Sequence, residues 1–252
     1  MSGHSHWARI KRAKAANDAK RGRVWSKLAR RIIVAAKTGG GNPDENLALR
    51  YAIDEAKAAN MPKDTIDKAV KKGTGELGAE SFEAVRYEGY GPGGVAFMVD
   101  CLTDNRNRTA PQMRKLFERA GGQLGETNCV AWMFEQKGTF VISEDAADED
   151  TLMEIALEAG ADDVRQDGNL FEIVCDVAAF SAVKQALAER PVETVSAEIG
   201  MIPTNTVAVG LDRAQQVLGL MEALEEHDDV QNVYANFDIP DEVMAEAEKT
   251  QS

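Results

Sequence analysis

Hydrophobic residues recur at helical spacing in the first third of the chain. On a helical projection of residues 19–37, one arc of about 120° holds the apolar side chains of Val24, Trp25, Leu28, Ile32, Ala35 and Ala36. A second helix is predicted to begin with a capping box from Asn42 to Glu45, and a third at 63–72. Residues 20–72 are therefore expected to form a small three-helix unit.

The pattern changes after the third helix. The segment KKGTGELGAES at 71–81 holds three glycines and a single large apolar residue, Leu77, which predicts a linker. Beyond it, strands at 82–90 and 95–102 flank a Gly/Pro turn. A helix is expected at 109–120, and its first residues, TAPQ, fit a T-x-x-Q capping box.

The next part of the chain alternates between strand and helix periodicity. The elements predicted there are a strand at 132–143, a helix at 150–159, two strands around the turn Asp167-Gly168, a helix at 177–190 and a strand at 193–201. Their order, β-α-β-β-α-β, is that of the split βαβ arrangement in ferredoxin-like domains.

The last part, 204–237, has a β-α-β pattern that would expose much apolar surface if it stood alone. It would complete the ββα pattern that precedes the ferredoxin-like segment. The expected fold is therefore α+β in three domains. These are a basic arm with an N-terminal helical bundle at 1–75, a discontinuous α+β middle domain at 80–132 and 204–240, and an inserted ferredoxin-like α+β domain at 133–203.

Charge is distributed very unevenly along the chain, whose net charge is -13. Residues 1–72 carry 17 Lys or Arg against 7 Asp or Glu, whereas residues 73–252, the acidic body, carry 12 against 35. Binding of a polyanion depends on local potential rather than on total charge. The basic N-terminal part therefore favours nucleic acid as a partner despite the sequence pI of about 4.8.

Cations gather on one side of the first helix. A second arc of about 120° holds Lys20, Arg23, Lys27, Arg30, Arg31 and Lys37, and no acid stands four residues further on to pair them. The arm before the helix adds Arg9, Lys11, Arg12 and Lys14, and Arg21 lies near the boundary. We predict that these cations contact nucleic-acid phosphates. The alternative is a solvated face that only aids solubility.

A second candidate contact lies in the segment LTDNRNRT, where Arg106 and Arg108 precede the helix expected at 109–120. Helix N-termini attract anions, and arginine can hold a phosphate with two hydrogen bonds. The alternative is that both arginines pair with acids of their own domain.

Motifs of catalysis are absent from the sequence. Gly89, Gly91 and Gly94 match GxGxxG, but the residues that follow have the pattern of a strand, so a hairpin turn is favoured over a dinucleotide site. The sequence has no GxxxxGK[ST], HExxH or GxSxG motif. We predict that the protein is not an enzyme and takes no cofactor or small-molecule substrate.

Metal sites and membrane spans are not predicted either. His4 and His6 lie in the arm, where short termini often offer accidental metal ligands. The three cysteines are far apart, without zinc spacing, and are interpreted as reduced, buried thiols of a cytosolic protein. No apolar run approaches the roughly 20 residues that cross a bilayer.

Several motifs, in this order along the chain, resemble the YebC family of bacterial regulatory proteins. They are SGHSHWARIKRAKAANDAKRG, TGGGNPDENLALRYAIDEAKAANMPKDTI, YEGYGPGG, LTDNRNRT, AGGQLGETNCVAWMF and SAEIGMIPTN. The resemblance covers nearly the whole chain and implies three domains, one of them ferredoxin-like and inserted in another. His6 departs from it, since the family more often has Lys at this position.

The resemblance also implies a function. Family members are described as probable transcriptional regulators that bind DNA in the cytoplasm and are not known as enzymes. A mitochondrial relative resembles a translational activator, and some bacterial members look like ribosome-associated factors. We expect a cytoplasmic nucleic-acid-binding regulator, by resemblance a DNA-binding one. The residues leave open the alternative, a translation factor that binds ribosomal RNA through the same basic surface.

Overall fold

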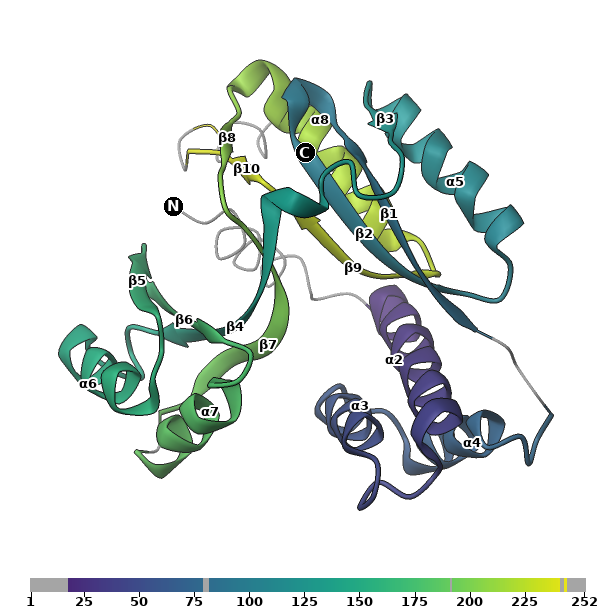
Figure 1. The fold of residues 1–252 in the computed structure, drawn as a ribbon, viewed down its shortest axis with the longest axis horizontal. Helices are drawn as coiled ribbons and strands as arrows, with labels where there is room; N and C mark the ends of the chain where they lie inside the picture. Colours follow the sequence, from purple (N-terminus) through teal and green to yellow (C-terminus); the bar gives the residue numbers. More distant parts are fainter. Residues whose placement is uncertain (1–17, 79–81, 191, 241–242, 244–252) are drawn as a thin grey trace.

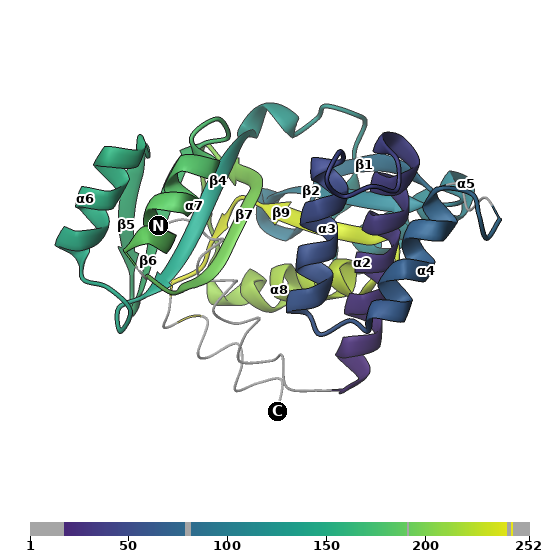
Figure 2. The ribbon, with the colours of Figure 1, turned by 90° about the horizontal axis from the view of Figure 1, so that it is seen from below.

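The structure, a computed structural model, describes residues 18–78, 82–190, 192–240 and residue 243. It has the α+β architecture in three domains that the sequence predicts. Figures 1 and 2 show the N-terminal helices and the inserted domain as two lobes beside the middle domain, which contains the central sheet. The boundaries 1–75, 133–203 and those of the split middle domain stay a prediction.

The N-terminal lobe consists of three helices, α2 (Asp18–Gly39), α3 (Leu47–Ala58) and α4 (Lys63–Gly73). Their apolar sides meet in one core, to which α2 contributes Leu28 and Ile32, α3 contributes Leu49, and α4 contributes Ile66. Because the hydrophobic stripe of α2 is used in this core, the cationic side of the helix faces away from α3 and α4.

The cap predicted for α3 is wrong by four residues. Asn46, not Asn42, is the N-cap, and its Oδ1 accepts the Leu49 N–H at 3.1 Å. The Asn46 amide also donates to the carbonyl oxygens of Ala35 and Gly40, both at 2.8 Å. These bonds satisfy carbonyls at the end of α2, whereas Asn42 only stabilises the turn before α3. Asn46 is therefore the residue that closes the connection between the two helices.

The middle domain has a four-stranded antiparallel sheet in the order β3-β1-β2-β9. Its strands are β1 (Glu83–Tyr90), β2 (Ala96–Thr103), β3 (Gln123–Leu124) and β9 (Val230–Ala235). The helices α5 (Arg106–Arg119) and α8 (Leu211–Glu226) cover one face, where Phe117 and Val217 pack with Phe97. Since β9 pairs with β2, segments from both sides of the inserted domain build one sheet.

Only part of the expected C-terminal β-α-β piece joins this sheet. The strand β8 (Val207–Ala208) pairs in parallel with β10 (Phe237–Asp238) and forms a separate two-stranded ladder. The Val207 N–H donates to the Asn236 carbonyl at 2.7 Å, which holds β8 beside the chain that leaves β9.

The turn between β1 and β2 confirms the hairpin interpretation of the three glycines. A short 3₁₀ turn, η1 (Pro92–Gly94), leads directly into β2, and Gly93 and Gly94 have φ angles of 73° and 77°. A Cβ atom at Gly89 would lie 2.5 Å from the Gln123 carbonyl oxygen. These glycines therefore serve a left-handed turn and close packing.

A buried carboxylate fixes the chain where it leaves the middle domain. Glu88 is 3% exposed, and its oxygens accept the N–H groups of Asn128, Val130 and Ala131 at 3.0, 2.9 and 2.9 Å. Three backbone donors are thereby satisfied in the loop that precedes the inserted domain.

The inserted domain has the strand order β5-β6-β4-β7, which is that of a ferredoxin-like sheet. Its elements are β4 (Phe134–Ser143), α6 (Glu149–Ala159), β5 (Asp163–Asp167), β6 (Leu170–Asp176), α7 (Phe180–Glu189) and β7 (Thr194–Pro203). The two helices cover one face, with Ile155 and Val183 against Phe140. Phe134 and Pro203 are register partners, so the chain enters and leaves by neighbouring strands.

Candidate nucleic-acid interface

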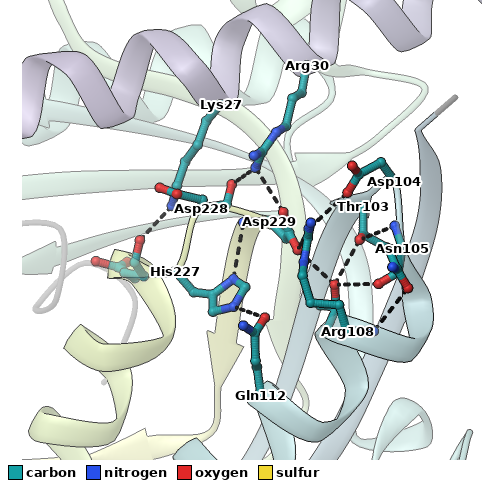
Figure 3. Close-up of polar contacts among 12 residues, drawn as sticks. Lys27, Arg30, Thr103, Asp104, Asn105, Arg108, Gln112, His227, Asp228 and Asp229 are labelled. Atoms are coloured by element: carbon teal, nitrogen blue, oxygen red, sulfur yellow. Dashed lines mark hydrogen bonds and ion pairs between the residues drawn. The ribbon is translucent and has the colours of Figure 1, made fainter. Parts of the chain in front are cut away.

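The cationic side of α2 lies against the connection between α8 and β9. This segment, EEHDDVQN at 225–232, contains four acids and is called the acidic turn below. Figure 3 shows Lys27 and Arg30 reaching from α2 toward Asp228 and Asp229 of the acidic turn.

Three cations of α2 make exposed or half-buried contacts with the acidic turn, and one of them also contacts α3. Arg23 Nη1 lies 2.8 Å from Glu226 Oε1, and about half of each side chain is exposed. Lys27 Nζ donates to the Glu225 carbonyl oxygen at 2.5 Å. Arg31 donates to the side-chain oxygens of Gln231 and Asn232 at 3.1 and 2.8 Å, and its Nη1 lies 2.8 Å from Glu55 Oε2.

Arg30 is more enclosed than Arg23 or Arg31. Its Nη1 lies 3.2 Å from Asp229 Oδ1, with 19% of the Arg30 side chain and 2% of the Asp229 side chain exposed. The guanidinium also donates to the Asp228 carbonyl and stands over the Phe82 ring, 5.5 Å from its centroid. This contact joins the N-terminal helices to the middle domain.

Although no acid stands four residues after these cations, Arg23, Arg30 and Arg31 have acidic partners in Glu226, Asp229 and Glu55. Spacing of four residues identifies ion pairs only within one helix. Glu226 and Asp229 lie about 200 residues further along the chain and reach α2 through the fold. Nucleic-acid contact by these cations stays a prediction.

Asp229 is the centre of a buried polar cluster. Besides Arg30, it accepts from Arg108 Nη2 and from the Thr109 hydroxyl, each at 2.7 Å. Burial opposes ionisation of Asp229, but the hydrogen bonds from Arg108 and Thr109 and the nearby arginine charges outweigh it and lower its pKa below the usual 3.8. The carboxylate is therefore charged at neutral pH and holds α2 and α5 on either side of it.

His227 connects the same turn to α5. Its Nδ1 accepts the Asp229 N–H at 3.1 Å, so Nε2 carries the proton and donates to Gln112 Oε1 at 3.0 Å. Burial lowers the pKa of His227 below its usual 6.5, although Asp229 and Asp228 act in the opposite direction. Since Nδ1 accepts a hydrogen bond, His227 is neutral in this arrangement. Figure 3 shows its contacts with Gln112 and the acidic turn.

The start of α5 differs from the prediction. Asn105 is the N-cap, since its Oδ1 accepts the Arg108 N–H at 3.1 Å, and Thr109 is a buried residue inside the helix. The predicted T-x-x-Q capping box does not form, because Thr109 lies inside the helix and its hydroxyl donates to Asp229. Arg108 pairs with Asp229 and with Asp104 at 2.9 Å, as in the alternative considered for it. Arg106 is exposed and lies 3.8 Å from Glu83.

The remaining predicted cations lie elsewhere. Arg9, Lys11, Arg12 and Lys14, like His4 and His6, are outside the described residues. Lys20 and Arg21 belong to the first turn of α2, where only the backbone is described, and Lys37 is exposed in its last turn.

Sequence reasoning missed three cations on α5. Arg114, Lys115 and Arg119 are exposed, and none forms an ion pair with another residue of the described ranges. Local composition could have identified them, because the α5 sequence RNRTAPQMRKLFER holds five cations and one acid within the otherwise acidic body.

Two family models match almost the entire chain. The model of the TACO1/YebC protein N-terminal domain matches residues 5–76, and that of the TACO1/YebC second and third domain matches residues 82–237. The chain belongs to the TACO1/YebC family. The contact between α2 and the acidic turn thus joins parts of the chain that two separate TACO1/YebC models describe.

Relatives in the TACO1/YebC family are similar over their full length. Two of them are named "Probable transcriptional regulatory protein". The one from Desulfatibacillum aliphaticivorans is 52% identical over 98% of this chain and 100% of its own length. The one from Dictyoglomus thermophilum is 54% identical over 97% of this chain and 98% of its own length. The crystal structure of a conserved hypothetical protein from Aquifex aeolicus is 48% identical, with a TM-score of 0.84, over 94% of this chain and 98% of that one.

The described part of this TACO1/YebC chain has no feature of a metal site or of a membrane-spanning helix. No group of three or more His, Cys, Asp or Glu residues is placed there to hold a metal ion, and no helix there is long and apolar enough to cross a membrane. The three cysteines are free, and burial raises the pKa of the Cys101 thiol to about 12. Cys129 is only half-buried, unlike Cys101 and Cys175, so the expectation of buried thiols is wrong for Cys129.

Proposed function

We propose that this protein is a non-enzymatic, cytoplasmic regulatory protein that binds nucleic acid through phosphate contacts of its N-terminal part. The observation that carries the proposal is the segregation of charge: residues 1–72 hold 17 of the 29 cations but only 7 of the 42 acids. The name of the relatives, probable transcriptional regulatory protein, supports a regulatory role and favours DNA as the partner.

The cations of α2 have different roles in this proposal. The Arg23–Glu226 pair is exposed, and such pairs contribute about 0–1 kcal/mol, so a phosphate can replace the carboxylate. Arg23 then acts together with Lys20, Arg21, Lys37 and the arm cations. Arg30 has a buried partner and serves to orient the N-terminal helices against the middle domain.

The acidic turn limits indiscriminate binding. Its carboxylates stand where phosphates would approach Arg23, so a polyanion must displace them before it reaches this part of α2. Phosphate contacts supply affinity without choosing a sequence, and competition from an intramolecular acid weakens every such contact alike.

Salt-dependent binding tests the proposal. If about five cations engage duplex DNA, log K of the full chain should fall against log[salt] with a slope of roughly -4 to -5. Replacing Lys20 and Arg23 by Gln should make that slope shallower by about 2. Arg50→Gln with Lys57→Gln is the matched control, because it removes two exposed cations from α3 of the same lobe. A flat salt response of the wild type would refute the proposal.

The same measurement with structured ribosomal RNA addresses the alternative partner. Crosslinking in growing cells, followed by sequencing of bound DNA and bound RNA, then identifies the target. Enrichment at promoters supports a transcriptional regulator, whereas enrichment on ribosomal RNA favours a translation factor that uses the same phosphate chemistry.

A further inference from the structure

The outer side of α5 is an unpaired cationic surface within the acidic body. Arg114, Lys115 and Arg119, called the α5 cations below, are exposed and have no acidic partner in the part of the chain that the structure describes. Figure 1 shows α5 at the outside of the middle domain, beside β3 and next to the β1 edge of the sheet.

The other described cations of residues 73–252 behave differently. Outside α5, five of them form ion pairs with acids. The pairs are Arg86 with Asp100, Lys137 with Asp162 and Asp176, Arg165 with Asp163, Arg190 with Glu154 and Glu158, and Arg213 with Asp212. Lys184 stands over the Tyr51 ring. In a region where acids outnumber cations almost three to one, three neighbouring unpaired cations on one helix are an exception.

The α5 cations form a short row. Thr109, Met113 and Phe117 follow one another at intervals of four and mark the buried side of α5. Lys115 and Arg119, also four apart, lie on the opposite side of the helix, and Arg114 is exposed between the two sides. Residues 114–119 rise by about 8 Å along the helix axis, so the row spans about two base-pair steps of a duplex.

The chemistry of this surface fits a phosphate backbone better than a protein. Protein interfaces are organised around buried apolar or aromatic anchors. Among the described residues, the exposed large hydrophobic side chains include none from α5. A nucleic acid needs no such anchor, because its phosphates present a continuous series of negative charges to a row of Lys and Arg.

The position of α5 relative to α2 also supports this partner. Asp229 contacts Arg30 of α2 and Arg108 of α5 at the same time, so the two basic helices are held on either side of one carboxylate (Figure 3). We propose that the outer side of α5 is a second phosphate-contact surface for the nucleic acid that the N-terminal part binds. This inference rests on the proposed function and adds the α5 cations to its binding surface.

Neutralisation of the row tests the inference in the full chain. The variant Arg114→Gln, Lys115→Gln, Arg119→Gln should bind duplex DNA and duplex RNA with a salt slope shallower by about 2–3 and an affinity at 0.1 M salt lower by about two orders of magnitude. The control Arg165→Gln, Arg190→Gln, Arg213→Gln changes the net charge equally but removes cations that are already paired. Circular dichroism and thermal unfolding establish that both variants are folded.

The outcomes separate this inference from the proposed function. Equal, small losses in both triple variants, with binding still dependent on Lys20 and Arg23, would overturn the role of α5 and leave the proposed function standing. No salt-dependent binding by the wild type would overturn both. A loss confined to the α5 variant supports the inference, and comparison of the DNA and RNA measurements shows which backbone is contacted. Arg114→Lys with Arg119→Lys should retain binding, because a phosphate contact needs the charge.

Discussion

Arg30 of α2 and Asp229 of the acidic turn form an ion pair with a 3.2 Å separation between Nη1 and Oδ1, although they come from opposite ends of the chain. Asp229 is 2% exposed and also receives hydrogen bonds from Arg108 and Thr109 of α5. A single carboxylate thus links α2, α5 and the β9 side of the sheet.

Asp229→Ala should lower the free energy of unfolding by roughly 3 kcal/mol, because it removes the partner of the largely buried Arg30 guanidinium and of the buried Thr109 hydroxyl. Urea unfolding of the purified chain measures the change. Asp228→Ala is the control, because the Asp228 side chain is exposed. Arg30 contacts only the backbone carbonyl oxygen of Asp228, which the substitution keeps. Equal losses in the two variants would contradict the role of Asp229.

His227 should make the protein less stable in mild acid. Its folded pKa lies below the usual 6.5, so the unfolded chain binds more protons between the two values and stability falls as the pH drops below about 6.5. The charges that face it are Asp228, Asp229, Arg108 and Lys27. His227→Gln should flatten the dependence of the unfolding free energy on pH in this range. If His227→Gln left this pH dependence unchanged, His227 would not be the cause of the loss of stability in mild acid.

Neutralising the acidic turn should strengthen nucleic-acid binding. Glu226→Gln with Asp228→Asn releases Arg23 and removes two exposed negative charges beside α2, so the affinity should rise about two- to fivefold at low salt. Glu144→Gln with Asp145→Asn makes the same charge change in the inserted domain and serves as control. A similar gain in both variants would mean that only net charge matters.

Gly89→Ala should lower the free energy of unfolding by about 1–3 kcal/mol, because its Cβ would meet the Gln123 carbonyl oxygen at 2.5 Å and the Phe117 ring at 2.9 Å. Thermal unfolding provides the measurement. Gly22→Ala, in α2, has no atom within 4 Å of the new Cβ and should be neutral or stabilising by about 0.5–1 kcal/mol. Tolerance of Gly89→Ala would contradict the close packing of β1 on β3 and α5.

The sequence predicted most elements but misplaced two helix caps. Amphipathic spacing locates α2 and the ferredoxin-like order of the inserted domain, because burial on one side repeats with the period of each element. Caps are harder, since Asn42 and Asn46 both precede α3, and Asn105 and Thr109 both offer oxygens near the start of α5. The choice between them follows from contacts with Ala35, Gly40 and Asp229.

Sequence by itself determined that this protein has a basic helical N-terminal part, an acidic body and an α+β fold in three domains, because periodicity and local charge are properties of neighbouring residues. Only the tertiary structure decided which cations are already paired. Whether Arg23 meets Glu226, or Arg119 meets no acid, depends on how α2, α5 and the acidic turn pack around the central sheet. That packing brings together residues whose separation along the chain contains no information about their distance in space.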